Sequence, residues 1–117
     1  MNETEKRIIQ LIDEHREDLI AMGDELYTRA ERGFAEVNTS AFIADKLKKL
    51  GLNVQTGLAG TGLRASAGKE GGVNVALISE LDGILCPSHP QAAPDGMSHA
   101  FGHHAQMTAM LGAAIAL

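Results

Sequence analysis

The chain has 117 residues, of which 44% are hydrophobic, 3% aromatic and 21% charged, with 13 Gly and 3 Pro. This length and composition fit one domain with a mainly aliphatic core, and they exclude collagen-like and broadly disordered proteins. The 10 basic and 15 acidic residues give a net charge of −5, and no Lys or Arg follows Lys69. Because proteins bind phosphate backbones through basic residues, we expect no nucleic-acid partner.

Cysteine content and hydropathy predict a cytoplasmic protein with no membrane contact. Cys86 is the only cysteine, so no internal disulfide can form, and a reducing compartment is the simpler setting. We expect Cys86 to be a partly buried bystander, with a soft metal ligand as the alternative. The polar N-terminus does not resemble a secretory signal. The long apolar run at 105–117 is shorter than the roughly 20 residues that span a bilayer.

Two amphipathic helices are predicted in the N-terminal half. Apolar residues recur at steps of three and four over residues 4–30, which is typical of one helix with a single apolar stripe. A second helix is expected to have its N-cap among residues 36–40. The lysines at 46–49 favour the negative end of a helix dipole, and Gly51 suits the residue that follows a helix.

Three strands are predicted next. Residues 52–56 and 63–67 alternate in polarity, and the glycines between them indicate a turn. Residues 73–78 are nearly all apolar, which is typical of a strand covered on both faces. All three prolines lie within residues 87–94, so residues 83–96 are predicted to form an irregular loop.

A final helix is expected from about residue 103 to residue 117. It is almost uncharged and apolar on many sides, so it needs cover from other elements. We therefore predict an incomplete α/β fold in which helices, a strand pair and a buried strand pack as layers. The uncovered side of residues 105–117 is expected to form an apolar patch that drives homo-oligomer formation.

Two groups of residues carry candidate chemistry. Glu80 and Asp82 follow the most buried predicted strand. Ligands of open α/β sheets bind beyond the carboxyl ends of strands, so these two acids are candidate site residues. The alternative is that they are only the solvated end of a strand. His99, His103 and His104 are clustered, and on a helix His99 and His103 would share one face, as a zinc pair requires. Loop histidines that bind no metal are the alternative. Together, the carboxylates and imidazoles suggest a divalent metal site.

Four segments carry motifs in a defined order: ERGFAEVNTS at 31–40, TG at 61–62, ALISELDG at 76–83 and HAFGHHAQM at 99–107. They resemble the PELGFEE…TS, TG, ALRAELDAL and HACGHDAHM segments of a family of metal-dependent amidohydrolases. This family includes aminoacylases, indole-acetyl-amino-acid hydrolases and aminobenzoyl-glutamate hydrolases, which are relatives of the zinc carboxypeptidases. The resemblance implies that residues 1–117 are the N-terminal part of a layered zinc-peptidase-like catalytic domain. The lid or dimerisation domain and the C-terminal half would lie outside these residues.

The resemblance also implies a site with two divalent cations, Zn or Mn, which activates a water to hydrolyse an amide bond. The substrates would be N-acyl amino acids or similar small-molecule amides. His103 keeps a family ligand position, whereas Phe101 stands where the family has a ligand Cys, and His104 replaces an Asp. Asp82 matches the acidic residue after the strand, and Glu80 takes the position two residues before it, as in this subfamily.

The family's general base belongs to a Glu-Glu pair that no residue here matches, so the catalytic residue is unassigned, with Asp82 a possible one. The predicted metal ligands are His103, Asp82, Glu80 and His99. His99 would replace the missing thiolate if residues 99–103 are extended. Because Phe101 cannot coordinate and other ligands are absent, we expect weak or no metal binding by this chain. The alternative function is a non-catalytic remnant or self-associating domain.

Overall fold

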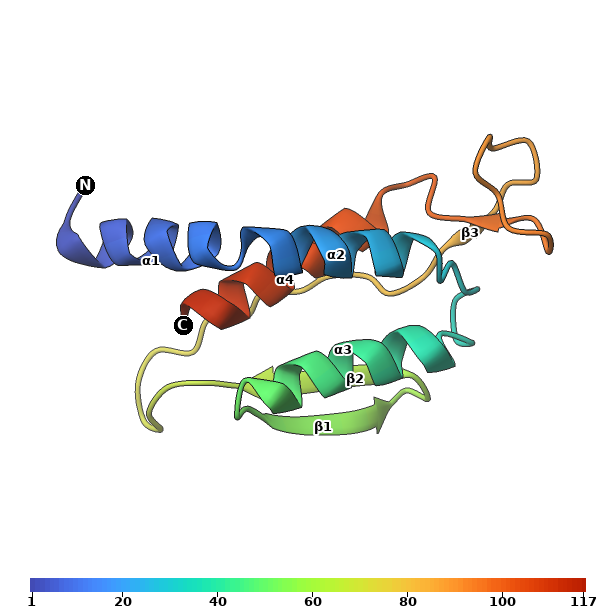
Figure 1. Cartoon of the computed structure of the whole chain (residues 1–117). Helices are drawn as coiled ribbons and strands as arrows, with labels where there is room; N and C mark the ends of the chain where they lie inside the picture. Colours follow the sequence, from blue (N-terminus) through green and yellow to red (C-terminus); the bar gives the residue numbers. More distant parts are fainter.

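A computed structural model describes all 117 residues. Helices α1 (Glu3–Glu14), α2 (Arg16–Tyr27) and α3 (Val37–Lys49) come first, followed by strands β1 (Asn53–Leu58) and β2 (Gly62–Ser66). The short strands β3 (Ile84–Leu85) and β4 (Met97–Ser98) precede α4 (His103–Ala116). Helix α4 contacts α1, α2 and α3, and the β1–β2 hairpin packs against α3 (Figure 1). The mixed helix and sheet content agrees with the predicted α/β class.

The hydrophobic core lies where α2, α3 and α4 meet. It consists of five buried side chains: Leu26, Ile43, Leu47, Met107 and Leu111. Burying each such side chain contributes about 1.5–3 kcal/mol. The radius of gyration is 15.3 Å, against about 13 Å for a compact chain of this length. The molecule is therefore elongated around a small core. None of its helices combines the length and the apolar character needed to cross a membrane.

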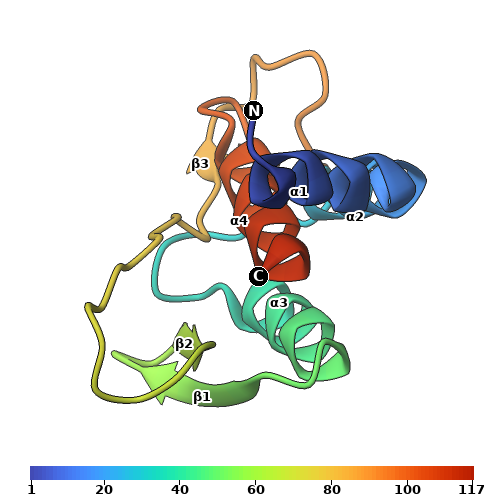
Figure 2. The same cartoon turned by 90° about the vertical axis from the view of Figure 1, so that its left-hand side faces the viewer.

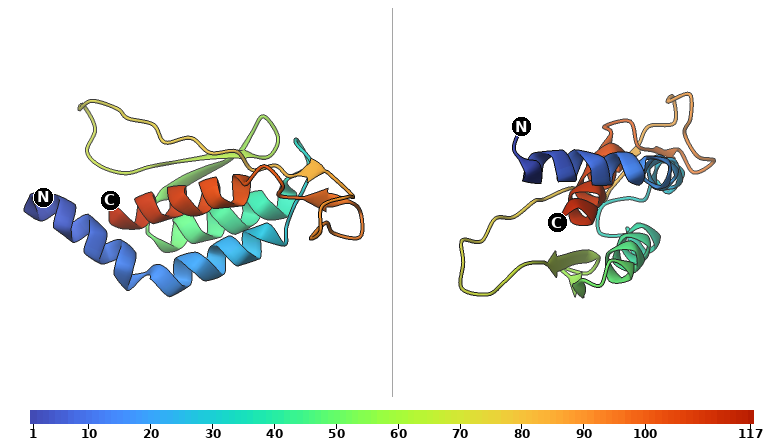
Figure 3. Two further views of the ribbon diagram at one scale, coloured as in Figure 1. Left: turned by 90° about the horizontal axis from the view of Figure 1, so that it is seen from above. Right: turned by 60° about the vertical axis from the view of Figure 1, so that its left-hand side comes forward.

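The prediction of a single helix over residues 4–30 is wrong, because the helix is interrupted at His15. This residue has φ −100° and ψ 11°, outside helical geometry, and its Nδ1 lies 2.9 Å from the carbonyl oxygen of Leu11. The break gives α1 and α2 different directions (Figure 3). Both helices still contact α4, so the change of direction allows each of them to pack on it.

Helix α3 forms as predicted, but its N-terminus is capped from outside the expected residues. The carboxylate of Glu31 accepts hydrogen bonds from the backbone N–H groups of Thr39 at 2.6 Å and Asn38 at 3.1 Å, and from the Thr39 hydroxyl at 2.6 Å. Burial alone would raise the pKa of Glu31. The hydrogen bonds from Thr39 and Asn38 outweigh burial and hold that pKa below its usual value. Gly51, with φ +81°, follows the helix as expected.

The predicted strands at 52–56 and 63–67 are confirmed as the antiparallel pair β1–β2. Asn53 lies opposite Ser66, and the turn between the strands reaches α3. There the Thr61 hydroxyl donates a hydrogen bond of 2.6 Å to the carboxylate of Glu36, the residue that precedes α3. The motif residues at 31–40 and 61–62 therefore join α3 to the hairpin.

The strand predicted at 73–78 does not form. Val73, Val75, Leu77 and Ile78 are 96%, 79%, 61% and 90% exposed. No hydrogen bond joins the backbone of this segment to another residue. The cause is the lack of a neighbour: β1 and β2 pair with each other, β3 pairs with β4, and a strand without a partner is not stable in water. Figure 2 shows the segment passing around the outside of the molecule.

Part of the apolar surface of residues 105–117, which is predicted to be uncovered, is covered in the structure. Met107 and Leu111 are buried, and the backbone of Gly112 faces the side chains of Ile12 and Leu19. Helices α1 and α2 both pack on α4, but Met110, Ile115 and the alanines between residues 113 and 116 are only partly buried, and Leu117 is exposed. Residues 73–78 expose four large apolar side chains in one continuous segment.

Candidate functional site

Three of the four predicted ligands lie together. His103, the first residue of α4, sits between two carboxylates, with Nε2 2.9 Å from Oε2 of Glu80 and Nδ1 3.0 Å from Oδ1 of Asp82. Its Nδ1 is also 2.9 Å from the backbone carbonyl oxygen of Asp82. The imidazole is 12% exposed, whereas the carboxylates of Glu80 and Asp82 are 62% and 40% exposed. One edge of this cluster is therefore open to solvent.

Two glycines position this cluster. Gly102 has φ +84°, a left-handed conformation that turns the chain into α4 and sets the direction of His103. Gly83 packs so closely that a Cβ there would lie 2.8 Å from both the Cβ of Ala30 and the carbonyl oxygen of Ser98. Its backbone N–H donates a hydrogen bond of 2.7 Å to the Glu31 carbonyl. The residues that carry the two carboxylates are thereby fixed against the α2–α3 connection and β4.

The cluster has more hydrogen-bond acceptors than donors. A neutral imidazole has one N–H, so His103 can donate to Glu80 or to Asp82 but not to both. Whichever carboxylate is left faces a nitrogen lone pair at hydrogen-bond distance. A positive charge at this place, either a second proton or a metal cation, removes that conflict. The donor set of His103 and Glu80 thus suits part of a divalent metal site.

The remaining ligands of a complete metal site are not present. No group of three or more His, Cys, Asp or Glu side chains is arranged to hold a metal ion. Phe101 is 71% exposed, with its ring 6.2 Å from that of His103, and a phenyl ring offers no donor. Cys86 lies in the proline loop, where its nearest polar neighbour is the Ser88 hydroxyl at 3.8 Å.

His99, the fourth predicted ligand, lies beside His104 instead of joining the two carboxylates. Its side chain is buried, and its ring centroid is 5.5 Å from that of His104. Burial, and then the nearby His104 and His103, lower the pKa of His99; the charge of Asp82 opposes this. Burial also lowers the pKa of His104, against the effect of Asp24.

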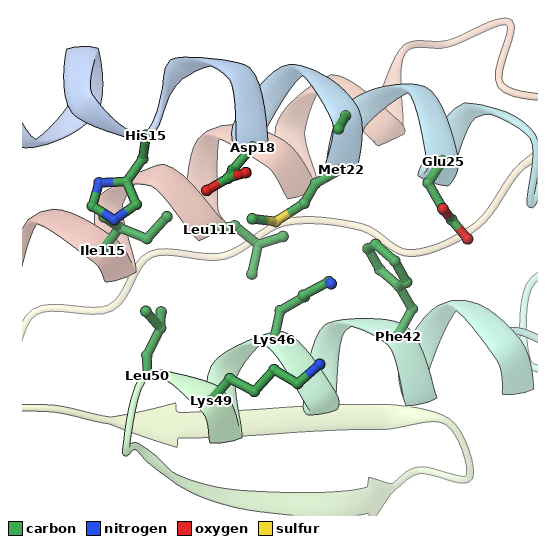
Figure 4. A pocket seen from close by; sticks show the side chains of 11 residues that line it. His15, Asp18, Met22, Glu25, Phe42, Lys46, Lys49, Leu50, Leu111 and Ile115 are labelled. Atoms are coloured by element: carbon green, nitrogen blue, oxygen red, sulfur yellow. The ribbon is translucent and has the colours of Figure 1, made fainter.

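A groove of about 410 Å³ lies between α2, α3 and α4, and none of the cluster residues lines it. Figure 4 shows its apolar floor, which includes Leu111, between rims of opposite charge. Asp18 and Glu25 come from α2, and Lys46 and Lys49 come from α3. The ammonium of Lys46 lies 5.0 Å from the centre of the Phe42 ring, and this cation–π contact partly stabilises its charge. We place no chemistry in this groove.

Sequence reasoning missed two contributions to the site region. Glu31 lies outside the first turn of α3, where an acid is expected to favour a helix N-terminus, so no sequence signal marks its capping role. Tyr27 was not singled out, yet its ring lies 4.6 Å from that of His104. No sequence signal marks this contact, because it depends on how α2 packs against α4.

The sequence is similar to several curated proteins. It is 33% identical over 103 residues to a protein named glutamate–cysteine ligase 2-3 from Rhodococcus jostii, covering 85% of this chain and 13% of that protein. It is 30% identical over 115 residues to a protein named amidohydrolase YhaA from Bacillus subtilis, and the match covers 94% of this chain and 29% of that protein. It is 30% identical over 101 residues to IAA-amino acid hydrolase ILR1-like 4 from Arabidopsis thaliana, and the match covers 82% of this chain and 23% of that protein.

The chain therefore spans between 13% and 29% of the length of these curated relatives. No family model matches the sequence. No solved structure matches it either.

Proposed function

We propose that the chain supplies part of the active site of a metal-dependent amidohydrolase. It is similar to amidohydrolases over most of its length, as its four motifs predict. The observation that supports this most is the placement of His103 between Glu80 and Asp82, since three of the matching motif positions meet there. The proposed substrates are N-acyl amino acids or similar small amides. We propose residues 1–117 as the N-terminal part of a zinc-peptidase-like catalytic domain.

The three residues have different roles in this proposal. Asp82 accepts a hydrogen bond from Nδ1 of His103, which fixes the tautomer and leaves Nε2 free to bind a cation. Glu80, 2.9 Å from Nε2, is the second donor. When bound, a divalent cation activates a water and polarises the scissile carbonyl. Asp82 is thus a positioning residue, and we assign no general base among the 117 residues.

The hydrolase names support this function better than the ligase name does. The match to the ligase-named protein covers 13% of that protein, whereas the matches to the two hydrolases cover 29% and 23%. Most of each protein is unmatched, but four of these relatives carry hydrolase names and one carries the ligase name.

Manganese binding tests the proposal, because carboxylate donors suit Mn²⁺. We expect the full 117-residue chain to bind Mn²⁺ weakly in calorimetry, and His103→Ala and Glu80→Gln to abolish the heat of binding. His89→Ala, in the proline loop, is the matched histidine control and should leave it unchanged. Mn²⁺ binding that survives His103→Ala unaltered would show that the cluster is not a metal site.

We propose self-association as a second function, because residues 73–78 expose apolar side chains along an unpaired backbone. An unpaired extended segment is a template for pairing with another chain, here a second copy. Burial of the apolar side chains would contribute about 25 cal/mol per Å². Sedimentation should show an assembly that Val75→Lys with Leu77→Lys dissociates and that Leu117→Lys leaves intact. A wild-type chain that is monomeric at high concentration would contradict this.

A further inference from the structure

His99 and His104 form a buried pair outside the His103 cluster. His99 is 4% exposed; the backbone of Leu26 approaches its ring, but no hydrogen bond of good geometry joins either ring nitrogen to a partner. Nδ1 of His104 is also buried without a partner, as is the hydroxyl of Ser98 beside the pair in sequence. Three imidazole nitrogens on two neighbouring rings thus lack partners.

Such a pair is unfavourable unless something satisfies it. Each imidazole has two polar nitrogens, and a buried polar group without a partner destabilises the fold. The nearest aromatic neighbour, Tyr27, covers one face of His104, with ring centroids 4.6 Å apart. Its hydroxyl donates to the side chain of Gln91 and therefore does not serve the imidazoles.

The spacing of the two rings fits a shared cation. A zinc–nitrogen bond of about 2.0–2.1 Å places the metal roughly 3.2 Å from the centroid of each imidazole, so a tetrahedral angle sets the centroids about 5 Å apart. The rings of His99 and His104 are 5.5 Å apart and tilted by 40°. The separation of the two rings is therefore close to that of two imidazoles bound to one tetrahedral metal ion.

We propose that His99 and His104 bind one divalent cation of the late first-row metals, such as Zn²⁺, through one ring nitrogen each. Imidazole is a preferred ligand of these metals, and the remaining coordination positions would be taken by water or a small ligand. This site uses neither Glu80 nor Asp82 and does not rest on the proposed amidohydrolase activity.

Nitrogen-15 spectra of the histidine rings test the proposal directly on the full wild-type chain. Zn²⁺ should shift one ring nitrogen of His99 and one of His104, and leave His89 and His15 unchanged. His103→Ala should retain both shifts while abolishing Mn²⁺ binding, which separates this site from the proposed catalytic one. His104→Gln should remove the Zn²⁺-induced shift of His99.

A substitution at the buried His99 could prevent folding, but the wild-type spectra do not depend on it. His104 is only partly buried and is therefore the better position to change. Zn²⁺ that shifts only the ring of His103 would overturn the proposal. A wild-type chain whose histidine rings do not respond to Zn²⁺ would overturn it as well, since water would then have to satisfy the buried nitrogens.

Discussion

The unit formed by α3 and the β1–β2 hairpin contrasts with residues 73–78, although both are rich in β-branched and aliphatic side chains. In the first, Ile43 is fully buried, and the carboxylates of Glu31 and Glu36 have hydrogen-bond partners close by. In the second, Ile78 is 90% exposed, and the backbone has no partner. The difference is the presence of partners: α3 packs into the core with α2 and α4, and β1 pairs with β2, whereas no strand pairs with residues 73–78. An apolar segment without a nearby partner stays uncovered.

The largest expected effect on stability comes from substituting one isoleucine in each region. Ile43→Ala removes a fully buried side chain from the core and should lower the free energy of unfolding by about 2–5 kcal/mol. Ile78→Ala, at a 90% exposed position, should change it by less than about 0.5 kcal/mol. Urea unfolding of both variants measures the difference. The measurement is made at a concentration where the chain is monomeric, and equal losses there would mean that residues 73–78 are covered within one chain, which would contradict the contrast.

The next effect concerns the point where the uncovered segment rejoins the packed part of the molecule. Gly83→Ala places a methyl group 2.8 Å from the Cβ of Ala30 and from the Ser98 carbonyl, so it should cost about 1–3 kcal/mol by overpacking. Gly72→Ala is the matched control, because nothing lies within 4 Å of a Cβ there. Thermal unfolding should rank the Gly83 variant below the control, and equal melting temperatures would argue against the close packing.

The smallest effect tests the cap of α3. Glu31→Gln keeps the shape of the side chain but removes its charge, and should cost about 0.5–2 kcal/mol at pH 7. Glu70→Gln, on the exposed turn before the uncovered segment, should cost almost nothing. Chemical unfolding at neutral pH measures both.

The same cap predicts a pH dependence. The pKa of Glu31 is lower in the folded chain than in the unfolded one, so the unfolded chain takes up the proton first as the pH falls. This contribution to stability is complete above about pH 5 and decreases as the pH drops through the folded-state pKa. Glu31→Gln should flatten that part of the stability profile. An unchanged slope would mean that the carboxylate is not held in its charged form.

Much of the fold could be predicted because its signals are local. The lysines and Gly51 mark the end of α3, and alternating polarity marks β1 and β2, each of which the structure confirms. The break at His15 could not be predicted, since the apolar stripe continues through it and the break depends on packing against α4. Residues 73–78 carry a strand pattern, but a pattern cannot supply a neighbouring strand.

The candidate site was predictable in part for the same reason. The motifs single out Glu80, Asp82 and His103 as candidate site residues, and the structure brings their side chains into contact. Which ring lies beside His99 could not be read from the sequence, because extended and helical conformations of 99–103 give different neighbours. The structure has a turn at Gly102 followed by helix, which pairs His99 with His104.

The central claim is that His103 with its two carboxylates is part of a metal site, and one variant tests it most directly. Phe101→Cys supplies a thiolate at the position where the related family has one, close to the ring of His103. Titration with Co²⁺, followed by absorption, should show thiolate coordination and tighter binding than Phe101→Ser, both lost when His103→Ala is added. Cobalt binding by the Cys variant that is no tighter than that of the Ser variant, or that persists without His103, would contradict the claim.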